Sequence, residues 1–394
     1  MQKTELKPSY YDQFACIGSK CEDTCCAGWR IDIDKKSYQK YKNEKNPTIR
    51  EDLKKNTQRN RQSQNDLQYG KFKLDADGKC TMLDEENLCT IQKTLGEKAL
   101  CHTCTIYPRQ NIQINQTIEK SLDTSCPEAA RLILLNKDGI DFIEDEAIQP
   151  ISYIEHIEKT EIEYQYFWDN RIFFISALQH RKHSIETRLL VIGLYINKIE
   201  NLSIKERMKQ SAYLSTHYLD LLDKLEEDEL LATFQTYPLI QTKLAHYFLK
   251  EFNTDSAYFK EIATSAFNSI DLLEDIIAFS EFINTYKKDY QNNSDIQIIL
   301  ENYLVNLVFT KYFESEAKTN IHFFSYLVIH FSLLRLLIIG NINHIDMNSQ
   351  SLVKIVQKFT KACSHSSIYF DEAVNILSEK EFSIASQAIH LLKI

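Results

Sequence analysis

The sequence predicts a mainly α-helical protein, in which a cysteine-rich N-terminal module with short β and turn pieces precedes an α-helical domain. Two observations support this prediction. Nine of the ten cysteines lie in the first 126 of 394 residues, and the chain has only eight glycines and six prolines. Scarce glycine and proline disfavour turn-rich β folds. We assign the module to residues 1–150 and the helical domain to residues 151–394, because a single proline follows Pro150.

The first half of the module is expected to hold several short elements. Ile31 and Ile33 alternate with aspartates, which indicates a short strand or a helix that begins at Asp34. The polar residues 43–67 indicate a surface insertion or an exposed helix. Residues 70–80 indicate an extended piece with a turn at Asp77-Gly78.

The second half of the module mixes helix and strand patterns. Residues 92–104 have helical spacing, which stops before Pro108. Residues 111–126 alternate like a strand at first, and Pro127 then fits the first turn of a helix. Behind the module, a capping box from Ser203 to Glu206 predicts a helix through Leu221. Further helices are expected within residues 187–199, 241–252, 295–313 and 351–363.

One segment, residues 321–339, is apolar and almost long enough to cross a bilayer. His322, His330 and Arg335 lie within it, and ionisable side chains are costly in hydrocarbon. We therefore predict a buried helix of a large α-domain and no membrane span.

The net charge argues against a nucleic-acid-binding protein, and the expected compartment bears on the role of the cysteines. The net charge is −9, and residues 1–126 carry 21 basic against 18 acidic side chains. Neither part of the chain is basic enough to predict nucleic acid as a partner. The first 14 residues lack the apolar stretch of a secretory signal, so we expect a cytoplasmic protein. Disulfides are unfavourable there, and clustered cysteines usually bind metal.

The thiols follow the pattern C-x4-C-x3-C-C, then C-x8-C-x11-C-x2-C, then one more cysteine. Soft thiolates suit zinc or iron–sulfur clusters, and a structural zinc site closes with four ligands. Two zincs, two clusters or one of each fit the number of thiols. Reduced thiols that only fill a core are the alternative without metal. The candidate ligands are Cys16, Cys21, Cys25, Cys26, Cys80, Cys89, Cys101, Cys104 and Cys126.

Two familiar cofactor motifs are missing from the sequence. The radical S-adenosylmethionine pattern C-x3-C-x2-C fails because Gly28 stands where the third cysteine belongs. The chain also has no G-x-G-x-G loop, which disfavours a nucleotide-binding sheet of the usual kind.

The cysteine-containing stretches carry a family resemblance. The segments YYDQFACIGSKCEDTCCAGWRIDIDKKSYQKY, CTMLDEENLCTIQKTLGEKALCHTCTIYPR and SCPEAA resemble the flagellin lysine-N-methylase (FliB) family. The first also resembles the broader CxxCxxCC group that chelates zinc or iron. The likeness is dense over residues 9–130, and parts of the helical domain are similar as well.

The resemblance implies a protein-lysine N-methyltransferase that moves methyl groups from S-adenosylmethionine to surface lysines of flagellin. It also implies a [4Fe–4S] cluster on the nine module cysteines, with zinc as the alternative metal. Two other classes stay open: a zinc-stapled binding module, and a protein that handles Fe–S clusters or electrons without methylating anything. The resemblance identifies neither the residues that bind S-adenosylmethionine nor the oligomeric state.

Roles beyond metal binding rest on side chains near the cysteines. A carboxylate or tyrosine is needed to accept the proton of the lysine. Arg109 is a candidate for the carboxylate of the donor, and Trp29 for its adenine or sulfonium. The simpler interpretation is a solvated carboxylate or helix cap for the acidic residues, a structural salt bridge for Arg109 and packing for Trp29, and we leave His102 out of the ligand set. The proton-acceptor candidates are Asp23, Asp32, Asp34, Asp84, Glu85 and Tyr107.

Overall fold

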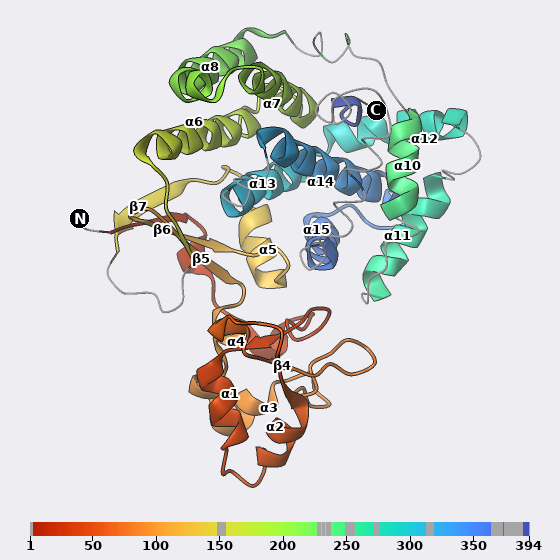
Figure 1. Ribbon diagram of the computed structural model, residues 1–394. Helices are drawn as coiled ribbons and strands as arrows, with labels where there is room; N and C mark the ends of the chain where they lie inside the picture. Colours follow the sequence, from red (N-terminus) through yellow and green to blue (C-terminus); the bar gives the residue numbers. More distant parts are fainter. Residues whose placement is uncertain are drawn as a thin grey trace.

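The computed structural model describes residues 3–147, 155–226, 230, 233, 238–248, 257–270, 276–312, 319–363, 373 and 389–393. It confirms a mainly helical chain with small sheets near the N-terminus. Figure 1 shows the cysteine-rich part as a separate lobe below a larger helical body. The boundary that we assign at residue 150 lies outside the described residues.

The lower lobe, which we call the thiol lobe, spans residues 16–107 and holds short elements around a three-stranded antiparallel sheet. The strand order is β2-β4-β3, so β3 is an edge strand. Asp34 accepts a hydrogen bond from the Ser37 N–H and caps α1, directly after β2, so the strand and the helix expected there both form. The elements are η2 (Gly18–Lys20), β2 (Asp32–Ile33), α1 (Lys35–Lys42), α2 (Arg50–Asn56), β3 (Thr57–Arg59), η3 (Asp66–Gln68), β4 (Gly70–Phe72), α3 (Thr90–Leu95), η4 (Glu97–Ala99) and α4 (His102–Ile106).

Three expectations for local structure are confirmed only in part. Residues 92–104 are helical at both ends but not as one helix, because Gly96 at φ +83° ends α3 and starts a short 3-10 turn before α4. Residues 43–67 do contain a helix, but Leu53 is fully buried and β3 follows it. The strand pattern after residue 110 is a hairpin, whose turn contains Asn115 at φ +51°. Asn tolerates this conformation better than most residues.

A five-stranded mixed sheet joins the thiol lobe to the helices. Its order is β7-β1-β6-β5-β8, with β1 parallel to β6 and β5 parallel to β8. In Figure 1 these strands and α5 lie between the lobe and the helical body. The elements are β1 (Thr4–Pro8), η1 (Tyr11–Gln13), β5 (Arg109–Ile114), β6 (Thr117–Leu122), α5 (Pro127–Leu134), β7 (Phe142–Glu146) and β8 (Glu155–Ile157).

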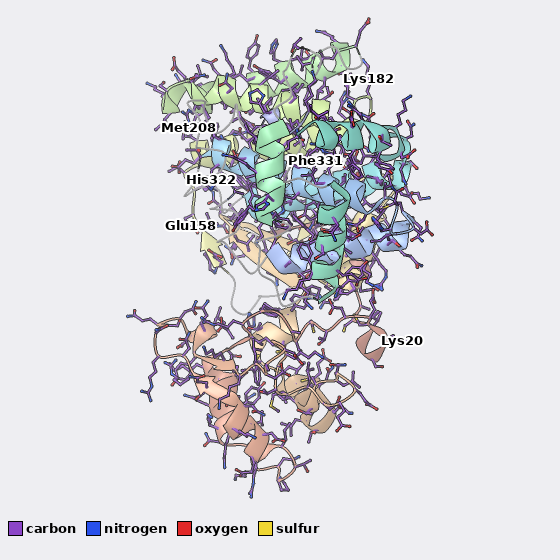
Figure 2. All side chains as sticks on the ribbon, turned by 90° about the vertical axis from the view of Figure 1, so that its right-hand side faces the viewer. Lys20, Glu158, Lys182, Met208, His322 and Phe331 are labelled. Carbon is purple, nitrogen blue, oxygen red and sulfur yellow. The ribbon has the colours of Figure 1, made fainter. Side chains whose placement is uncertain are left out.

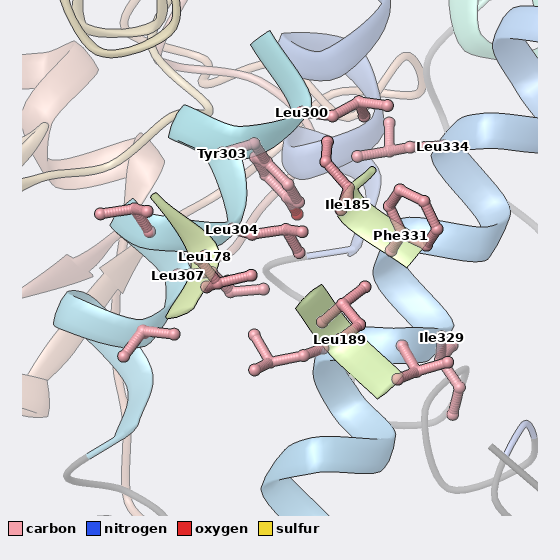
Figure 3. Close-up of a cluster of buried hydrophobic side chains, with 14 of the residues drawn as sticks. Leu178, Ile185, Leu189, Leu300, Tyr303, Leu304, Leu307, Ile329, Phe331 and Leu334 are labelled. Atoms are coloured by element: carbon pink, nitrogen blue, oxygen red, sulfur yellow. The ribbon is translucent and has the colours of Figure 1, made fainter. Parts of the chain in front are cut away.

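The helical body packs around a large apolar core. Figure 3 shows side chains of α7, α13 and α14 meeting there, among them Leu189, Leu304 and Phe331. The predicted capping box at Ser203 is present and opens α8. The helices are α6 (Glu161–Leu178), α7 (Ile185–Glu200), α8 (Ile204–Lys224), α10 (Pro238–His246), α11 (Ala257–Ile270), α12 (Ile276–Asn292), α13 (Ser294–Lys311), α14 (Asn320–Asn341) and α15 (Ser349–Cys363).

Helix α14 is the apolar segment that resembles a membrane span. Among the described helices it is the one long and apolar enough to cross a bilayer, and 94% of its most apolar window is buried inside the protein. Arg335 is buried in it and donates to Glu186 and to the carbonyls of Leu391 and Leu392. The expected buried helix of a large α-domain is confirmed.

Buried ion pairs tie the sheet to the helices. Arg171 of α6 forms two hydrogen bonds, 2.6 and 2.7 Å long, with the carboxylate of Glu119 on β6. It also donates to the carbonyl of Phe309 on α13 at 2.6 Å. Both charged side chains are almost completely buried. Paired geometry of this kind is what makes a buried charge tolerable.

Candidate metal centre

Four of the module cysteines form two close pairs. The Sγ atoms of Cys25 and Cys26 are 4.0 Å apart, and those of Cys101 and Cys104 are 3.5 Å apart. The Cys80 N–H donates to the carbonyl of Cys26 at 2.7 Å, which ties a third segment to the first pair. The ten cysteines all lie within the described ranges, and none of them forms a disulfide.

Electrostatic interactions connect the remaining thiols to these pairs. Burial raises the pKa of four thiols, and the nearby Cys25 thiol raises it further; the four are Cys21, Cys80, Cys89 and Cys126. The pKa of Cys104 is raised by its hydrogen bond with Cys101, by burial, and by the thiols of Cys26 and Cys89. Electrostatic interactions of this kind connect eight of the nine predicted ligands, and Cys16 is the ninth; Cys16 and Cys25 are both exposed. Lys20, from the loop that contains both, lies beside the junction between lobe and helical body (Figure 2).

Local backbone geometry favours the thiolate form at three positions. Cys89, Cys101 and Cys126 are the N-cap residues of α3, α4 and α5; their thiols form no capping hydrogen bond, but the main-chain N–H groups of the first turns act to lower their pKa. Such donors stabilise sulfur anions. Burial acts against them and raises the pKa of Cys126 to about 12, whereas a hydrogen bond with Cys104 lowers the pKa of Cys101. A bound cation would remove the penalty of burying these thiolates.

The thiols fit a soft metal in chemistry and, for two pairs, in spacing. A tetrahedral zinc site with Zn–S bonds of ~2.3 Å has sulfurs ~3.8 Å apart. The two pairs lie on either side of this value. As the side chains stand, no three His, Cys, Asp or Glu residues in the described ranges are placed to hold one ion.

The carboxylates considered as proton acceptors have structural partners. Asp34 accepts the N–H groups of Ser37 and His102, so its capping role is confirmed. Asp84 forms an ion pair with Lys93 and accepts the main-chain N–H of Leu88 in the same turn. Asp32 forms an ion pair with Arg30. Glu85 is exposed in the same turn as Asp84.

The aromatic and basic candidates pack beside the thiols. Trp29 stacks on Tyr107 with ring centroids 5.7 Å apart, and its indole N–H donates to the carbonyl of Cys25. Burial raises the pKa of Tyr107 well above its ordinary value, so it stays a phenol, hydrogen-bonded to Ser125 at 3.0 Å. Arg109 covers the ring of Phe14 at 4.9 Å. Packing roles account for all three contacts.

Asp23 has a role that the sequence did not reveal. It reaches from the cysteine loop to α15, where it accepts hydrogen bonds from Lys358 at 2.6 Å, from Lys361 at 3.1 Å and from Gln357 at 3.2 Å. Burial opposes its ionisation, yet the two lysines hold the pKa of Asp23 below its ordinary value. We call this contact the Asp23 anchor. Its only sequence signal is a pair of lysines three residues apart on the last described long helix.

The fold defines a class: a thiol-rich lobe joined through a small mixed sheet to a large helical body. The helical body carries the match that identifies it, because residues 171–391 fit the model of the FliB lysine N-methylase C-terminal domain. The chain therefore belongs to the FliB lysine N-methylase family, as its cysteine motifs indicate.

Individual relatives agree with this assignment. The chain is 40% identical over 138 residues to the flagellar biosynthetic protein FliU of Salmonella muenchen, which covers 35% of this chain and 80% of that protein. It is 40% identical over 154 residues to a lysine-N-methylase of Salmonella typhimurium and 39% identical to one of Salmonella choleraesuis. These matches span 37% of this chain but only 36% of each lysine-N-methylase. No solved structure matches the chain.

Proposed function

We propose that this protein is a cytoplasmic protein-lysine N-methyltransferase that moves methyl groups from S-adenosylmethionine to surface lysines of flagellin. The family match over the helical body is the observation that carries the proposal. Relatives named lysine-N-methylase and flagellar biosynthetic protein support the reaction and the substrate.

We further propose that the activity depends on a [4Fe–4S] cluster in the thiol lobe. The resemblance of the cysteine motifs supports the choice of a cluster, and the candidate ligands within the lobe include Cys25, Cys26, Cys80, Cys89, Cys101 and Cys104. When bound, the cluster would link the cysteine loop to the starts of α3 and α4 through its thiolate ligands. The Asp23 anchor then fixes that loop against α15 of the helical body.

Two aromatic residues, Trp29 and Tyr107, stack on each other beside the thiol of Cys25. Burial raises the pKa of Tyr107, which makes the phenolate that would accept the lysine proton less favourable, and its hydroxyl is hydrogen-bonded to Ser125. Trp29 covers one side of the same region. Methyl transfer requires a neutral amine, a bound sulfonium and a dry site.

The test is anaerobic incubation of reconstituted protein with flagellin and S-adenosylmethionine, followed by mass spectrometry of flagellin peptides. The proposal expects the mass of one or more methyl groups on lysines. The matched controls are protein without donor and donor without protein. Unmodified flagellin, with the cluster present and intact, would count decisively against the proposal.

A zinc-stapled lobe is the second candidate, and the spacing of the two thiol pairs favours it. Both Sγ–Sγ distances are close to the separation of two thiolates bound to one tetrahedral zinc. The thiolates of a [4Fe–4S] cluster each bind a different iron and therefore lie farther apart. Metal analysis with visible absorbance separates the two: a cluster is coloured and contains about four irons with sulfide. A colourless protein that contains zinc would favour the zinc-bound lobe over the cluster, and methylation would then be tested with the zinc-bound protein.

A further inference from the structure

A concave, strongly basic surface lies on the thiol lobe, among residues that metal binding does not use. We call it the basic groove. It is lined by residues 54–62, except Asn56, together with Tyr38, Lys71 and Lys73, and encloses about 760 Å³. Six of the eleven lining residues are lysine or arginine, and none is acidic. A groove lined by charges of one sign attracts ligands of the opposite sign.

The positive side chains of the groove lie close to one another and have few carboxylate partners. Burial and then repulsion by Lys73 and Lys54 lower the pKa of the neighbouring Lys42. Lys55, Arg61 and Lys73 are exposed. Lys54 meets a carboxylate at 3.5 Å, that of the exposed Glu51 outside the groove, a contact worth little.

All three residues of the edge strand β3 line the groove. Because Lys73 N–H donates to the Asn56 carbonyl, Asn56 faces β4. Main-chain groups of an antiparallel ladder alternate in direction, so Thr57 and Arg59 face away from the sheet. The main-chain N–H of Thr57 donates to a carbonyl of the preceding helix α2, and the carbonyl of Thr57 accepts a hydrogen bond from Lys42. Arg59 therefore directs its main-chain N–H and C=O out of the sheet at the groove.

We propose that the basic groove binds an extended acidic segment of a protein partner, which adds as a strand beside β3. Strand addition supplies main-chain hydrogen bonds, and the surrounding lysines supply affinity for the acidic side chains. Edge lysines also discourage aggregation. That role explains single exposed lysines but not a concave surface free of acidic lining residues. The inference goes beyond the proposed methylation and does not depend on it.

The aromatic content of the groove favours a peptide over single-stranded nucleic acid. Nucleic acid in such grooves is held by bases that stack on aromatic rings. Tyr38 is the aromatic residue that lines this groove. Its ring packs edge-on against Tyr69 and is covered by the Lys42 ammonium at 5.3 Å. The groove therefore offers charge and a strand edge, but no stacking platform.

The experiment measures fluorescence anisotropy of a labelled peptide of alternating glutamate and threonine, added to the full chain without methyl donor. We expect saturable binding that K71E/K73E weakens by at least about tenfold. The control K205E/K209E changes the net charge equally on the exposed face of α8 and should leave binding within about twofold. A peptide with the same sequence and N-methylated main chain should bind more weakly.

Three results would overturn the proposal. The first is equal loss of binding in K71E/K73E and K205E/K209E, which would show a general charge effect. The second is tighter binding of a single-stranded oligonucleotide of equal charge. The third is unchanged affinity for the N-methylated peptide, which would exclude strand addition. Circular dichroism of both double variants verifies that a loss of binding is not a loss of fold.

Discussion

The thiol lobe and the helical body are built on cores of different composition. The core of the lobe is small, and Cys80 and Cys101 are buried in it beside Ile33 and Leu53. The core of the body is a large continuous set of aliphatic and aromatic side chains, supplemented by buried ion pairs. Small cores usually need a metal or disulfide for stability. The lobe should therefore depend on metal, and the body should not.

Removal of metal is expected to have the largest effect and to be confined to the lobe. Binding of metal to structural thiol sites contributes on the order of 10 kcal/mol in small domains. After anaerobic chelation, amides of α1, β4 and α3 should lose protection from hydrogen exchange, while those of α13 and α14 keep theirs. Equal loss of protection in both regions would contradict the division into two cores.

Arg171→Met tests the body alone. Removing one partner of a buried ion pair leaves Glu119 charged and buried, at a cost of about 3–5 kcal/mol. Urea denaturation should detect this loss, whereas the metal content of the lobe should not change. Arg30→Met breaks the half-exposed pair with Asp32 and should cost less than about 1 kcal/mol. A similar loss of unfolding free energy in the two variants would argue against a buried ion pair between β6 and α6.

Asp23→Asn tests the contact between lobe and body. The variant leaves Lys358 and Lys361 without their carboxylate, which should cost about 2 kcal/mol. Trypsin should then cut the cysteine loop after Lys20 several-fold faster. The matched control is Glu22→Gln, one residue away, which removes a half-exposed pair with Arg131. Unchanged proteolysis in Asp23→Asn would show that the anchor does not hold the loop.

The smallest expected effect is a pH dependence at Lys159, beside β8. Burial lowers the pKa of Lys159 from 10.5 to about 8. Between these pH values the unfolded chain binds more protons than the folded chain, so folding stability should rise with pH through this window. The gain should be about 1–2 kcal/mol, reduced because solvent reaches part of the side chain. Lys159→Met should remove this rise in unfolding titrations. The same slope in the variant would assign it to another group.

The helices of the body were predictable because long apolar periodicity and caps specify them locally. The capping box at Ser203 is an example, and outside the body the proline at the start of α5 is another. The five-stranded sheet was not predicted as a whole. Its strand β1 lies 113 residues from its parallel neighbour in the Thr4–Thr117 pair, and no local pattern reports such a pairing. Gly96 breaks the helical pattern before Cys101 because its positive φ ends α3.

The candidate site was predictable in composition but not in arrangement. The spacing of the cysteines predicts a metal-binding module, and the structure places Cys25 beside Cys26 and Cys101 beside Cys104. Which thiols pair depends on contacts between distant segments, such as the one from Cys80 to Cys26. The Asp23 anchor joins residues more than 330 positions apart. Sequence periodicity carries no information about such a contact.

Anaerobic analysis of metal and sulfide in the purified protein tests the central claim most directly. The account predicts stoichiometric iron and sulfide in the native chain, and their loss in Cys101→Ser and Cys104→Ser. Cys363→Ser should keep both, because Cys363 is buried in the core of the helical body. Metal-free protein whose thiol lobe is folded, or loss of metal in Cys363→Ser alone, would contradict the claim.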